Sequence, residues 1–361
     1  MESEEIYKMS WEDNVRKVVP YTPGEQPSDT QKVIKLNTNE NPYPPSPKVF
    51  EAAAGMDVSN LRLYPAADVG PLRDAIADHY GFSSDQVFVG VGSDDVLSVA
   101  FLTFFNSDRP VLFPDITYSF YDVWADVYRI PYEVKPLDES FHIVKSDYMC
   151  ENGGIVIANP NAPTGVSEME DIDFIEDIVS ANRQSVVIVD EAYVDFGGIS
   201  ALPLVEKYDN LLVVRTFSKS RSFAGVRIGY AFGNNKLIKY LNDVKYSINS
   251  YTMNRPAIDL GIAAISDVEY FEETVSKITA TRQWSIEEFR KRGFEVSDSK
   301  TNFLFASPKC IGAKELFAKL REKNIYVRWW DKPRLREYLR ISVGTDEEMK
   351  ALLAAVDEIC G

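Results

Sequence analysis

NLLVVRTFSKSRSFAGVRIGY, residues 210–230, contains a strand followed by an unusual polar segment. The aliphatic run from Leu211 to Val214 predicts a buried strand, since branched aliphatic side chains favour that conformation. Lys219 follows among hydroxyl groups, and three arginines lie close by in sequence, Arg215, Arg221 and Arg227. Cations this close together repel unless an anion is bound or one of them loses its charge. The stretch therefore predicts either an anion site at a strand end or a solvated basic loop.

Six other short apolar segments are also typical of strands. They cover residues 86–92, 109–115, 132–137, 153–160, 185–193 and 226–233. Helical patterns lie between several of them, for example at 94–105 and 168–181. Strands that are apolar throughout and alternate with helices predict an α/β fold with a mostly parallel seven-stranded sheet between helices. Ligands of such sheets bind at the carboxyl ends of the strands.

The pattern changes towards the C-terminus, where long charged helices precede two short strands and a last helix. This change predicts a second, smaller α+β domain over residues 259–361, after a large domain over residues 41–258. Residues 1–40 are rich in Pro, Asn and Thr, so we expect an N-terminal arm that also contributes to the small domain.

The bulk composition excludes several classes of protein. The chain has 361 residues and a formal net charge of −16, which disfavours non-specific binding to nucleic acid or to an anionic membrane. No apolar run approaches the roughly 18 residues needed to span a bilayer. The acidic start, MESEEIYKMSWEDN, is unlike a signal peptide. We therefore expect a cytoplasmic protein that binds neither nucleic acid nor membranes.

Cysteines and histidines are too few and too scattered for several chemistries. Cys150, Cys310 and Cys360 are widely spaced, which predicts neither a disulfide framework nor a zinc site. His79 and His142 are the two histidines, so a histidine-based metal site or a Ser-His-Asp triad is improbable. We expect no metal, and a structural role for His79 near the end of a helix.

Polar residues follow several predicted strands at the edge where a ligand would bind. Ser93 opens a helical pattern, whose free N–H groups and positive dipole end suit a phosphate. Capping of that helix by Ser93 or Asp94 is the alternative. Residues 159–165, NPNAPTG, form a turn made rigid by two prolines. Asp190 ends a strand of valines and isoleucines, where a carboxylate is costly to bury unless it meets a cation.

One cofactor, pyridoxal 5′-phosphate, meets these requirements together. Lys219 would form a Schiff base with its aldehyde, and neighbouring cations help to keep the amine neutral enough to attack. Asp190 would hold the pyridine nitrogen protonated, which makes the ring an electron sink. The helix N-terminus at Ser93–Asp95, with Ser218 and Arg227, would hold the phosphate. On this interpretation the cluster of cations around Lys219 surrounds a bound phosphate.

Three motifs in this order, NPNAPTG, DEAY and SKSRSFAGVRIGY, resemble the fold-type I pyridoxal-phosphate aminotransferases. Within that family the chain is most similar to the histidinol-phosphate aminotransferases. KLNTNENPYPPSP, the LYP around Tyr64, PDITYSFY and YLRISVGTDEEM carry this second resemblance. The resemblance covers almost the whole chain, and the lysine and aspartate motifs are its most specific parts.

The resemblance implies roles for residues around the cofactor. Lys219 is the Schiff-base lysine and proton shuttle, and Asp190 is the partner of the pyridine nitrogen. Tyr193 donates a hydrogen bond to the ring hydroxyl, and Tyr118 stacks on the ring unless it is simply a core aromatic. The phosphate is held by Ser93, Asp94, Asp95, Ser218 and Arg227.

The resemblance also implies a homodimer with shared active sites and a pair of substrates. Tyr64 would reach the phosphate of the partner subunit's cofactor, and Tyr21 on the arm would close over the substrate. Arg340 would bind the carboxylate of glutamate or 2-oxoglutarate, and with Arg328 the phosphate of histidinol phosphate. A surface salt bridge is the alternative role for either arginine.

Two features depart from the family pattern. Many members have asparagine directly before the final Pro-Thr-Gly of the turn, where this chain has Ala162. Either Asn161 contacts the ring hydroxyl instead, or Tyr193 acts alone. Trp329 and Trp330 are also unusual, and they either line the substrate pocket or pack the small domain.

The implied reaction exchanges an amino group between L-histidinol phosphate and 2-oxoglutarate, which gives imidazole-acetol phosphate and L-glutamate in histidine biosynthesis. Three alternatives remain open. An aromatic amino acid aminotransferase would use the same mechanism with a different pocket. A lyase similar to threonine-phosphate decarboxylase would need no oxo-acid acceptor. A regulator with an aminotransferase-like domain would normally carry a basic DNA-binding module, which the acidic arm does not resemble.

Overall fold

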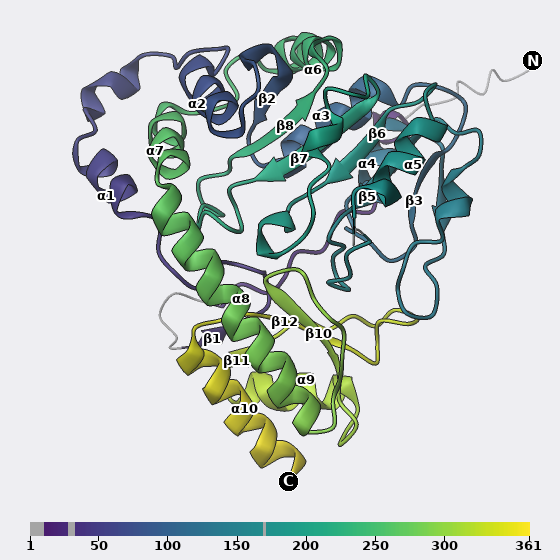
Figure 1. The fold of residues 1–361 in the computed structure, drawn as a ribbon, viewed down its shortest axis with the longest axis vertical. Coiled ribbons are helices and arrows are strands. Elements are labelled where there is room, and N and C mark those ends of the chain that lie inside the picture. The colour runs from purple at the N-terminus through teal and green to yellow at the C-terminus, as the bar shows by residue number, and fades with distance from the viewer. Residues whose placement is uncertain (1–10, 28–32, 169–170) are drawn as a thin grey trace, which may run out of the picture.

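Seven strands form the central sheet of the larger part of the molecule (Figure 1). The computed structural model describes residues 11–27, 33–168 and 171–361. The strand order is β2-β8-β7-β6-β5-β3-β4, and β8 alone in this sheet runs antiparallel to its neighbours. The predicted α/β fold with a mostly parallel seven-stranded sheet is therefore confirmed. The strands are β2 (Val87–Gly90), β3 (Val111–Pro114), β4 (Tyr132–Lys135), β5 (Gly154–Ala158), β6 (Val187–Asp190), β7 (Leu211–Thr216) and β8 (Gly229–Gly233).

Helices cover both faces of this sheet because alternate strand residues point to opposite sides. On one face Ile188 and Leu212 pack in a core with α3 (Ser93–Phe104), α4 (Tyr121–Tyr128) and α6 (Asn235–Ile248). On the other face Val187 and Val213 pack in a core with three further helices, α2 (Gly70–Tyr80), α5 (Asp173–Ala181) and α7 (Arg255–Ser266). Strands buried on both faces explain why each of them is apolar throughout.

The smaller part lies below the sheet in Figure 1 and is built around a three-stranded antiparallel sheet. Its strands are β9 (Glu295–Val296), β10 (Phe303–Ser307) and β12 (Leu339–Ser342), and its helices are α8 (Val268–Lys291), α9 (Ala313–Glu322) and α10 (Asp346–Cys360). A parallel pair adds β1 (Ile34–Lys35) to β11 (Ile325–Tyr326), and Leu36 packs in the same core. The long helix α8 connects the two parts (Figure 1).

The predicted boundary between residues 258 and 259 falls within α7. Ala257 and Ile258 of this helix pack in the core of the larger part. Helix α7 also packs against α2 and against α1 (Pro47–Ala54). Helix α8, which begins at Val268, contacts both parts, since its Ile278 packs with Phe196 and its Arg282 donates to Phe196 O.

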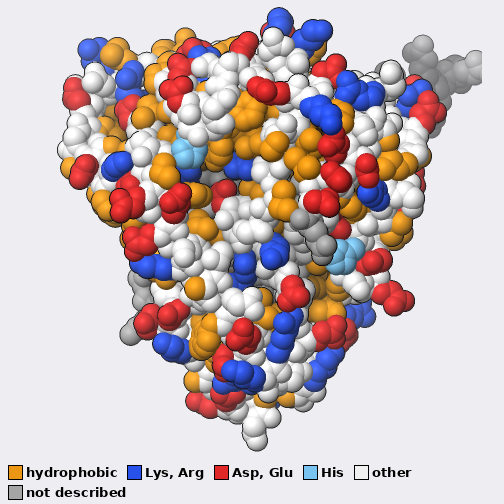
Figure 2. All heavy atoms as spheres, viewed as in Figure 1, with side chains coloured by type: hydrophobic (Ala, Val, Ile, Leu, Met, Phe, Trp, Pro, Cys, Tyr) orange, Lys and Arg blue, Asp and Glu red, His pale blue; other side chains and the backbone are white. Residues whose placement is uncertain are grey.

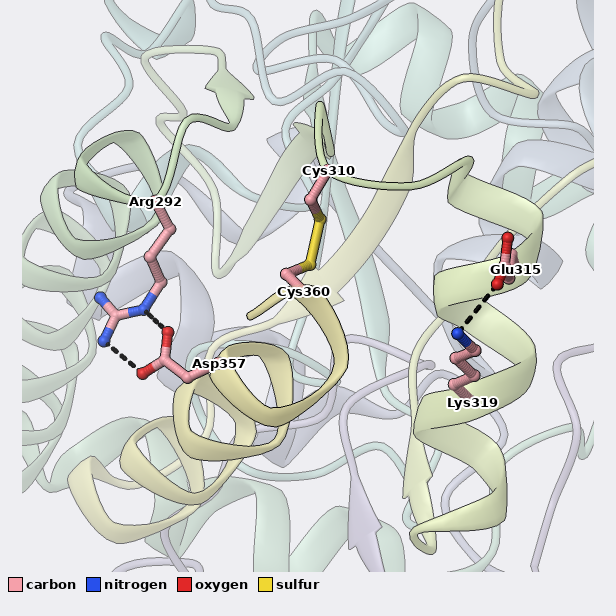
Figure 3. The surroundings of a disulfide bond; sticks show 6 residues. All are labelled: Arg292, Cys310, Glu315, Lys319, Asp357 and Cys360. Atoms are coloured by element: carbon pink, nitrogen blue, oxygen red, sulfur yellow. Dashed lines mark hydrogen bonds and ion pairs between the residues drawn. A yellow bond between two sulfur atoms is a disulfide. The ribbon is translucent and has the colours of Figure 1, made fainter.

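Cys310 and Cys360 form a disulfide in the smaller part (Figure 3). Cys310 lies before α9, and Cys360 is the last residue of α10. Close by, Arg292 after α8 forms an ion pair with Asp357 of α10, with Nε and Oδ1 2.6 Å apart. The sequence spacing predicts no disulfide, and this expectation is wrong because folding brings together two positions that are 50 residues apart.

Membrane and metal features are absent from the part of the chain that the structure describes. None of the helices in residues 11–27, 33–168 and 171–361 is long and apolar enough to cross a bilayer. In those same ranges, no cluster of three or more His, Cys, Asp or Glu side chains could hold a metal ion. Acidic and basic side chains are mixed over the face shown in Figure 2.

A buried ion cluster fixes the end of β7 against the segment after β6. Arg215 donates from Nε to Glu191 Oε2 and from Nη2 to Ser200 Oγ, both at 2.9 Å. Asp195 Oδ1 lies 3.5 Å from Nη1. Arg215 and Glu191 are only 6% and 2% exposed, so neither charge is well solvated without the other. The cluster joins the two strands whose ends carry Asp190 and Lys219.

Replacing Arg215 with Met is expected to lower the free energy of unfolding by about 3–5 kcal/mol, because Glu191 is then left buried without its cation. Urea unfolding followed by circular dichroism measures the change. Arg183→Gln is the control, since Arg183 forms an exposed pair with Asp209 and its loss should cost less than about 1 kcal/mol. Equal effects of the two substitutions would contradict the proposed importance of the cluster.

Candidate active site

The polar residues at the strand ends meet around one cavity at the carboxyl edge of the sheet. We call it the inner cavity. Eight of the residues that the sequence predicts for the site line it, Ser93, Asp94, Tyr118, Asp190, Tyr193, Ser218, Lys219 and Arg227. They come from the start of α3, the segment before α4, the end of β6 and the loop after β7. Parallel strands explain the convergence, since their carboxyl ends share one edge.

Lys219 reaches this cavity without a carboxylate partner among the described residues. Its Nζ donates to the carbonyl oxygen of Thr38 at 3.3 Å and lies 5.7 Å from the centre of the Tyr193 ring. The backbone of the lysine loop is held by Asn41, whose Nδ2 donates to the carbonyl oxygens of Lys219 and Ser220. The amine is thus positioned by its loop while its own reactive end faces the cavity.

Asp190 is a buried carboxylate without a cationic partner in the part of the chain described. It accepts hydrogen bonds from Tyr121 OH at 2.8 Å and from the backbone N–H of Ala192 at 3.1 Å. Burial raises the pKa of Asp190 to about 6, although the hydrogen bond from Tyr121 opposes the shift. A cation in the cavity beside Asp190 would offset the desolvation that raises this pKa. The sequence analysis missed Tyr121, because a buried tyrosine is usually a core residue.

The N-terminus of α3 forms the wall of the inner cavity opposite Lys219. Gly92 precedes the helix with a φ of 90°, and β8 passes so close that a Cβ on Gly229 would lie 2.2 Å from the carbonyl carbon of Gly92. The backbone N–H groups of the first helical turn have no partner within the helix and are directed along its axis. This geometry is an anion cradle made largely of backbone.

Arg227 and Ser218 complete that cradle. Arg227 Nη1 donates to Ser218 Oγ at 3.4 Å, and its Nη2 lies 3.1 Å from Asp94 Oδ2. Asp94 also accepts a hydrogen bond from Tyr118 OH at 2.7 Å. Asp95 differs from the others, because its carboxylate accepts the N–H of Val91 at 2.8 Å and does not line the cavity. Only the backbone N–H of Asp95 remains for an anion.

Asn161 does not line the inner cavity, although the sequence analysis offered it as a contact of the cofactor's ring hydroxyl. Its Nδ2 donates to Ile116 O and Thr164 Oγ1, and its Oδ1 accepts from Thr117. These bonds fix the turn 159–165 and satisfy the whole amide. Ala162 lies on the cavity wall instead, which leaves Tyr193 as the hydroxyl group on this side.

Asn39 is a further residue of the site that the sequence analysis missed. Its Nδ2 donates to Tyr193 OH at 2.8 Å, and its backbone N–H donates to Ser342 Oγ at 2.8 Å. Asn39 is almost fully buried and has a φ of 57°, a left-handed conformation that asparagine tolerates better than most residues. The only signal in the sequence is its place in the polar stretch KLNTNENP.

A second, outer cavity adjoins the first and shares Tyr118, Ala162 and Tyr193 with it. Its other walls carry Tyr21, Trp330 and Arg340. Arg340 Nη2 donates to Asn37 O at 3.0 Å, while its buried Nε has no hydrogen-bond partner among the described residues. Burial lowers the pKa of Arg340, and no carboxylate of the described chain pairs with it. The guanidinium group is therefore arranged to receive an anion from the cavity.

The two adjacent tryptophans have different environments. Trp330 lines the outer cavity, with the guanidinium carbons of Arg340 and Arg328 at 5.1 and 5.3 Å from its ring centre. Trp329 packs against the core of the smaller part and donates from Nε1 to Arg336 O. Trp330 thus lines a cavity and Trp329 packs the smaller part. The two differ because neighbouring side chains of an extended segment point to opposite sides.

Arg328 and Tyr64 do not line either cavity of this chain. Arg328 donates from its two terminal nitrogens to the carbonyl oxygens of Thr22 and Pro23. Tyr64 is 78% exposed and stacks on Tyr251, with ring centres 4.6 Å apart. An exposed position is what a residue contributed to another subunit requires.

Two of the three arginines near Lys219 in sequence point away from the cavity. Arg215 belongs to the buried cluster with Glu191, and Arg221 donates to Ala264 O and to His79 Nε2. Arg221 also lies over the ring of Phe271 at 4.2 Å. The expectation that the whole cluster surrounds one anion is wrong, because each of these side chains has its own partners and only Arg227 reaches the cavity.

The residues present fit the cofactor expected from the sequence. The start of α3 and Arg227 offer N–H donors to a phosphate, and in the described chain Asp190 lacks a cation and Lys219 lacks a carboxylate. Tyr118 and Ala158 also line the cavity, where they would contact a flat ring. A buried aspartate at one strand end and a lysine after the neighbouring strand define the fold-type I class of pyridoxal-phosphate enzymes.

Comparison with known proteins places the chain within this class. Residues 31–356 match the aminotransferase class I and II family, and the chain belongs to that family. Histidinol-phosphate aminotransferase of Lactococcus lactis subsp. cremoris (strain MG1363) is 50% identical over 350 residues, which cover 97% of this chain and 98% of that protein. The enzyme of the same name from Clostridium botulinum (strain Okra / Type B1) is 48% identical over 349 residues, or 97% and 98% of the two chains.

A solved structure shows the same fold. Histidinol-phosphate aminotransferase from Sinorhizobium meliloti, in complex with pyridoxal-5′-phosphate, has a TM-score of 0.83 to this chain. The match covers 91% of this chain and 92% of that one at 24% identity. At this level of identity the comparison concerns the fold, and the chemistry rests on the site described above.

The pairing of His79 with Arg221 makes stability depend on pH. Burial, followed by the charge of Arg221, lowers the pKa of His79 from 6.5 to about 4. The unfolded chain therefore binds more protons than the folded one between these values, so the free energy of unfolding should fall as the pH is lowered through this window. His79→Gln keeps an acceptor for Arg221 and should make stability less dependent on pH there. Urea titrations between pH 4 and 7 measure the free energy of unfolding of both proteins. An equal loss in wild type and in His79→Gln as the pH falls would contradict the role of His79.

Proposed function

We propose that this protein transfers an amino group between L-histidinol phosphate and 2-oxoglutarate with pyridoxal 5′-phosphate as cofactor. The products are imidazole-acetol phosphate and L-glutamate. The observation that carries the proposal is the pair of adjoining cavities, one with Lys219 and Asp190 and the other with the unpaired donor of Arg340. The histidinol-phosphate aminotransferases that are about half identical to this chain support the choice of substrate.

When bound, the cofactor supplies an aldehyde and an electron-withdrawing pyridinium ring. Lys219 is the side chain positioned for attachment to that aldehyde. Asp190 would hold a protonated ring nitrogen, because a cation beside this buried carboxylate offsets the desolvation that raises its pKa. Tyr118 would cover one face of the ring, and Tyr193, which accepts a hydrogen bond from Asn39, would donate to the ring hydroxyl.

The cradle at the start of α3 would hold the phosphate of the cofactor. The backbone N–H groups of Ser93, Asp94 and Asp95 would donate to it, together with Ser218 Oγ and Arg227. The Asp94 carboxylate holds Arg227 and Tyr118 in place from the side. This arrangement keeps the negative charge of the side chain beside the arginine rather than against the phosphate.

Substrate anions bind in the outer cavity against Arg340. Its buried Nε has no partner among the described residues and would supply one N–H donor to a carboxylate or a phosphate. The free amine of Lys219 would be the group in the inner cavity available to accept and return a proton at the substrate carbon. Its position beside Thr38 O and Tyr193 lets it serve as this base.

The active form is a homodimer in which Tyr64 reaches the cofactor phosphate of the second subunit. Several apolar side chains close to Tyr64 in sequence are exposed, namely Val58, Leu61 and Leu63. Tyr251, on which Tyr64 stacks, is exposed as well. Such a concentration of exposed apolar side chains is typical of a protein interface. The division into an arm over residues 1–40, a large domain over residues 41–258 and a small domain over residues 259–361 is likewise our proposal.

The experiment that tests the function is a single turnover of the purified, cofactor-loaded protein without an oxo acid. Histidinol phosphate, phenylalanine and threonine phosphate are mixed with it separately, and the cofactor absorbance is followed. Histidinol phosphate should convert the cofactor to its amine form much faster than phenylalanine does. A faster reaction with phenylalanine would identify an aromatic amino acid aminotransferase, and carbon dioxide release from threonine phosphate would identify a lyase.

Replacing Lys219 with Ala should abolish covalent attachment of the cofactor, because no other amine of the described residues lines the inner cavity. Borohydride reduction followed by mass spectrometry measures the attachment. Lys300→Ala is a control outside both cavities, and it should keep the mass increase of the wild type. Labelling of the Lys219→Ala protein at another lysine would show that the site is wrongly assigned.

Replacing Arg340 with Gln should raise the KM for 2-oxoglutarate by about 10- to 100-fold, because hydrogen bonds from a charged group contribute about 1.5–3 kcal/mol. Steady-state kinetics with both substrates measures the effect. Arg336→Gln serves as the control, since Arg336 lies on the surface near Asp331 and lines neither cavity. An unchanged KM in the Arg340 variant would remove the anion-binding role of this residue.

A further inference from the structure

Asn39 connects the two parts of the molecule through a chain of hydrogen bonds. Its Nδ2 donates to Tyr193 OH at 2.8 Å, and Tyr193 follows β6 of the larger part. On the smaller part, Asn302 Nδ2 donates to Asn39 O at 3.0 Å, and Ser342 on β12 bonds to both the backbone N–H and the Oδ1 of Asn39. Asn39, Asn302 and Ser342 are all buried, so the bonds among them form away from water.

The hydroxyl group of Ser342 fixes the direction of this chain. Ser342 Oγ accepts the N–H of Asn39 at 2.8 Å, and it has one proton of its own to donate. The acceptor of that proton among the described residues is Asn39 Oδ1, at 3.1 Å. If the amide of Asn39 were turned round, Nδ2 would face Ser342, and the hydroxyl proton would be buried without an acceptor in the described chain, which is unfavourable. The Nδ2 of Asn39 therefore points at Tyr193.

Tyr193 consequently keeps its own proton for the cavity. Its hydroxyl oxygen accepts from Asn39, and no acceptor among the described residues receives its proton. Tyr193 lines both cavities, whereas Ala162 beside it offers no polar side chain, and the amide of Asn161 is used in other bonds. A hydroxyl group that accepts a hydrogen bond becomes a stronger donor, because the bonds of a chain polarise one another. Tyr193 is thus prepared as a donor to a ligand in the inner cavity.

We infer that Ser342 and Asn39 are positioning residues that reserve the proton of Tyr193 for the ring hydroxyl of the cofactor. The inference rests on the proposed function, because it concerns the proposed contact of Tyr193 with that hydroxyl. Ser342 follows Arg340 by two positions on β12, and alternate residues of a strand point to the same side. One strand of the smaller part thereby serves both the proposed anion site and the cofactor site.

The test compares how tightly the whole chain, freed of its cofactor, binds pyridoxamine 5′-phosphate and an analogue of it that lacks the ring hydroxyl. Neither ligand has an aldehyde, so neither attaches covalently to Lys219. Isothermal titration calorimetry measures the two Kd values. The Kd of the analogue divided by the Kd of pyridoxamine 5′-phosphate is the preference for the ring hydroxyl, and general damage to the site affects both values alike. Tyr193→Phe removes the donor and should lower this preference by about three- to tenfold.

Ser342→Ala should lower the preference by about two- to fivefold, because the amide of Asn39 can then turn and accept the proton of Tyr193. Ser285→Ala is the matched control. Ser285 is another buried serine of the smaller part, and it donates to Thr281 O at 2.7 Å and has no hydrogen bond with Asn39. The control should keep the preference of the wild type. An unchanged preference in Ser342→Ala would overturn the inference.

A double-mutant cycle shows whether Ser342 acts through Tyr193. The variant that combines Tyr193→Phe with Ser342→Ala should have the same preference as Tyr193→Phe alone, since no proton then remains to be directed. A further fall, close to the product of the two single effects, would overturn the inference, because Ser342 would then act on the ring hydroxyl by another route.

A second variant covers the case in which Ser342→Ala does not fold. Ser342→Cys keeps a side chain of similar shape, but a thiol is a weak hydrogen-bond donor and acceptor. The preference for the ring hydroxyl should fall in this variant too, and a preference equal to that of the wild type would contradict the role of Ser342.

These measurements separate the inference from the proposed function, since binding of the two ligands involves no amino transfer. A wild-type enzyme that does not convert histidinol phosphate would refute the proposed function, while the preference of the Ser342 variants would still decide the inference. A wild type that binds both ligands equally would overturn the inference alone, because no hydrogen bond from Tyr193 would then reach the ring hydroxyl.

Discussion

Asp190 is a carboxylate buried at the end of an apolar strand with no cation beside it in the described chain, and much of the larger part serves to keep it there. Tyr121 and the N–H of Ala192 satisfy its oxygens in part, but burial still raises its pKa to about 6. Such a group is unfavourable in a protein that lacks a ligand. It becomes favourable when a protonated ring nitrogen is bound, so the fold is arranged for its cofactor.

Keeping that carboxylate in place requires a rigid sheet edge. The neighbouring strands β6 and β7 are joined by parallel pairing and by the buried cluster of Arg215 with Glu191. This cluster fixes the distance between Asp190 and the loop of Lys219. On the far side, β8 runs against the start of α3 with no space for a side chain at Gly229. The parts of the binding site are thereby set by strand pairing, by a buried ion pair and by close backbone packing, all of which are rigid.

The sequence was sufficient for the sheet and for the ends of its strands. Strands buried on both faces leave a continuous apolar run, and a charged residue at the end of such a run is conspicuous, so Asp190 and Lys219 could be found. It was not sufficient for residues whose role depends on a distant partner. Asn39 meets Tyr193 across 154 positions, and Arg215 turns to Glu191 instead of towards an anion.

Local hydrogen bonding explains the remaining differences. Asp95 and Asn161 are polar residues in the right motifs, yet Asp95 accepts the nearby N–H of Val91, and Asn161 bonds to Thr164 of its own turn and to Thr117 of the segment before α4. Short polar side chains have this tendency wherever the backbone offers a partner nearby.

The segment between β11 and β12 that contains Trp329 and Trp330 shows why two neighbours in sequence acquire unrelated roles. An extended segment at the border of a core presents alternate side chains to opposite sides. Trp329 therefore completes the core of the smaller part, and Trp330 faces the outer cavity. On that side Trp330 contacts the guanidinium groups of both Arg328 and Arg340. The outer cavity is therefore a property of the boundary between the two parts, since its walls include Tyr118 of the larger part and Arg340 of the smaller part.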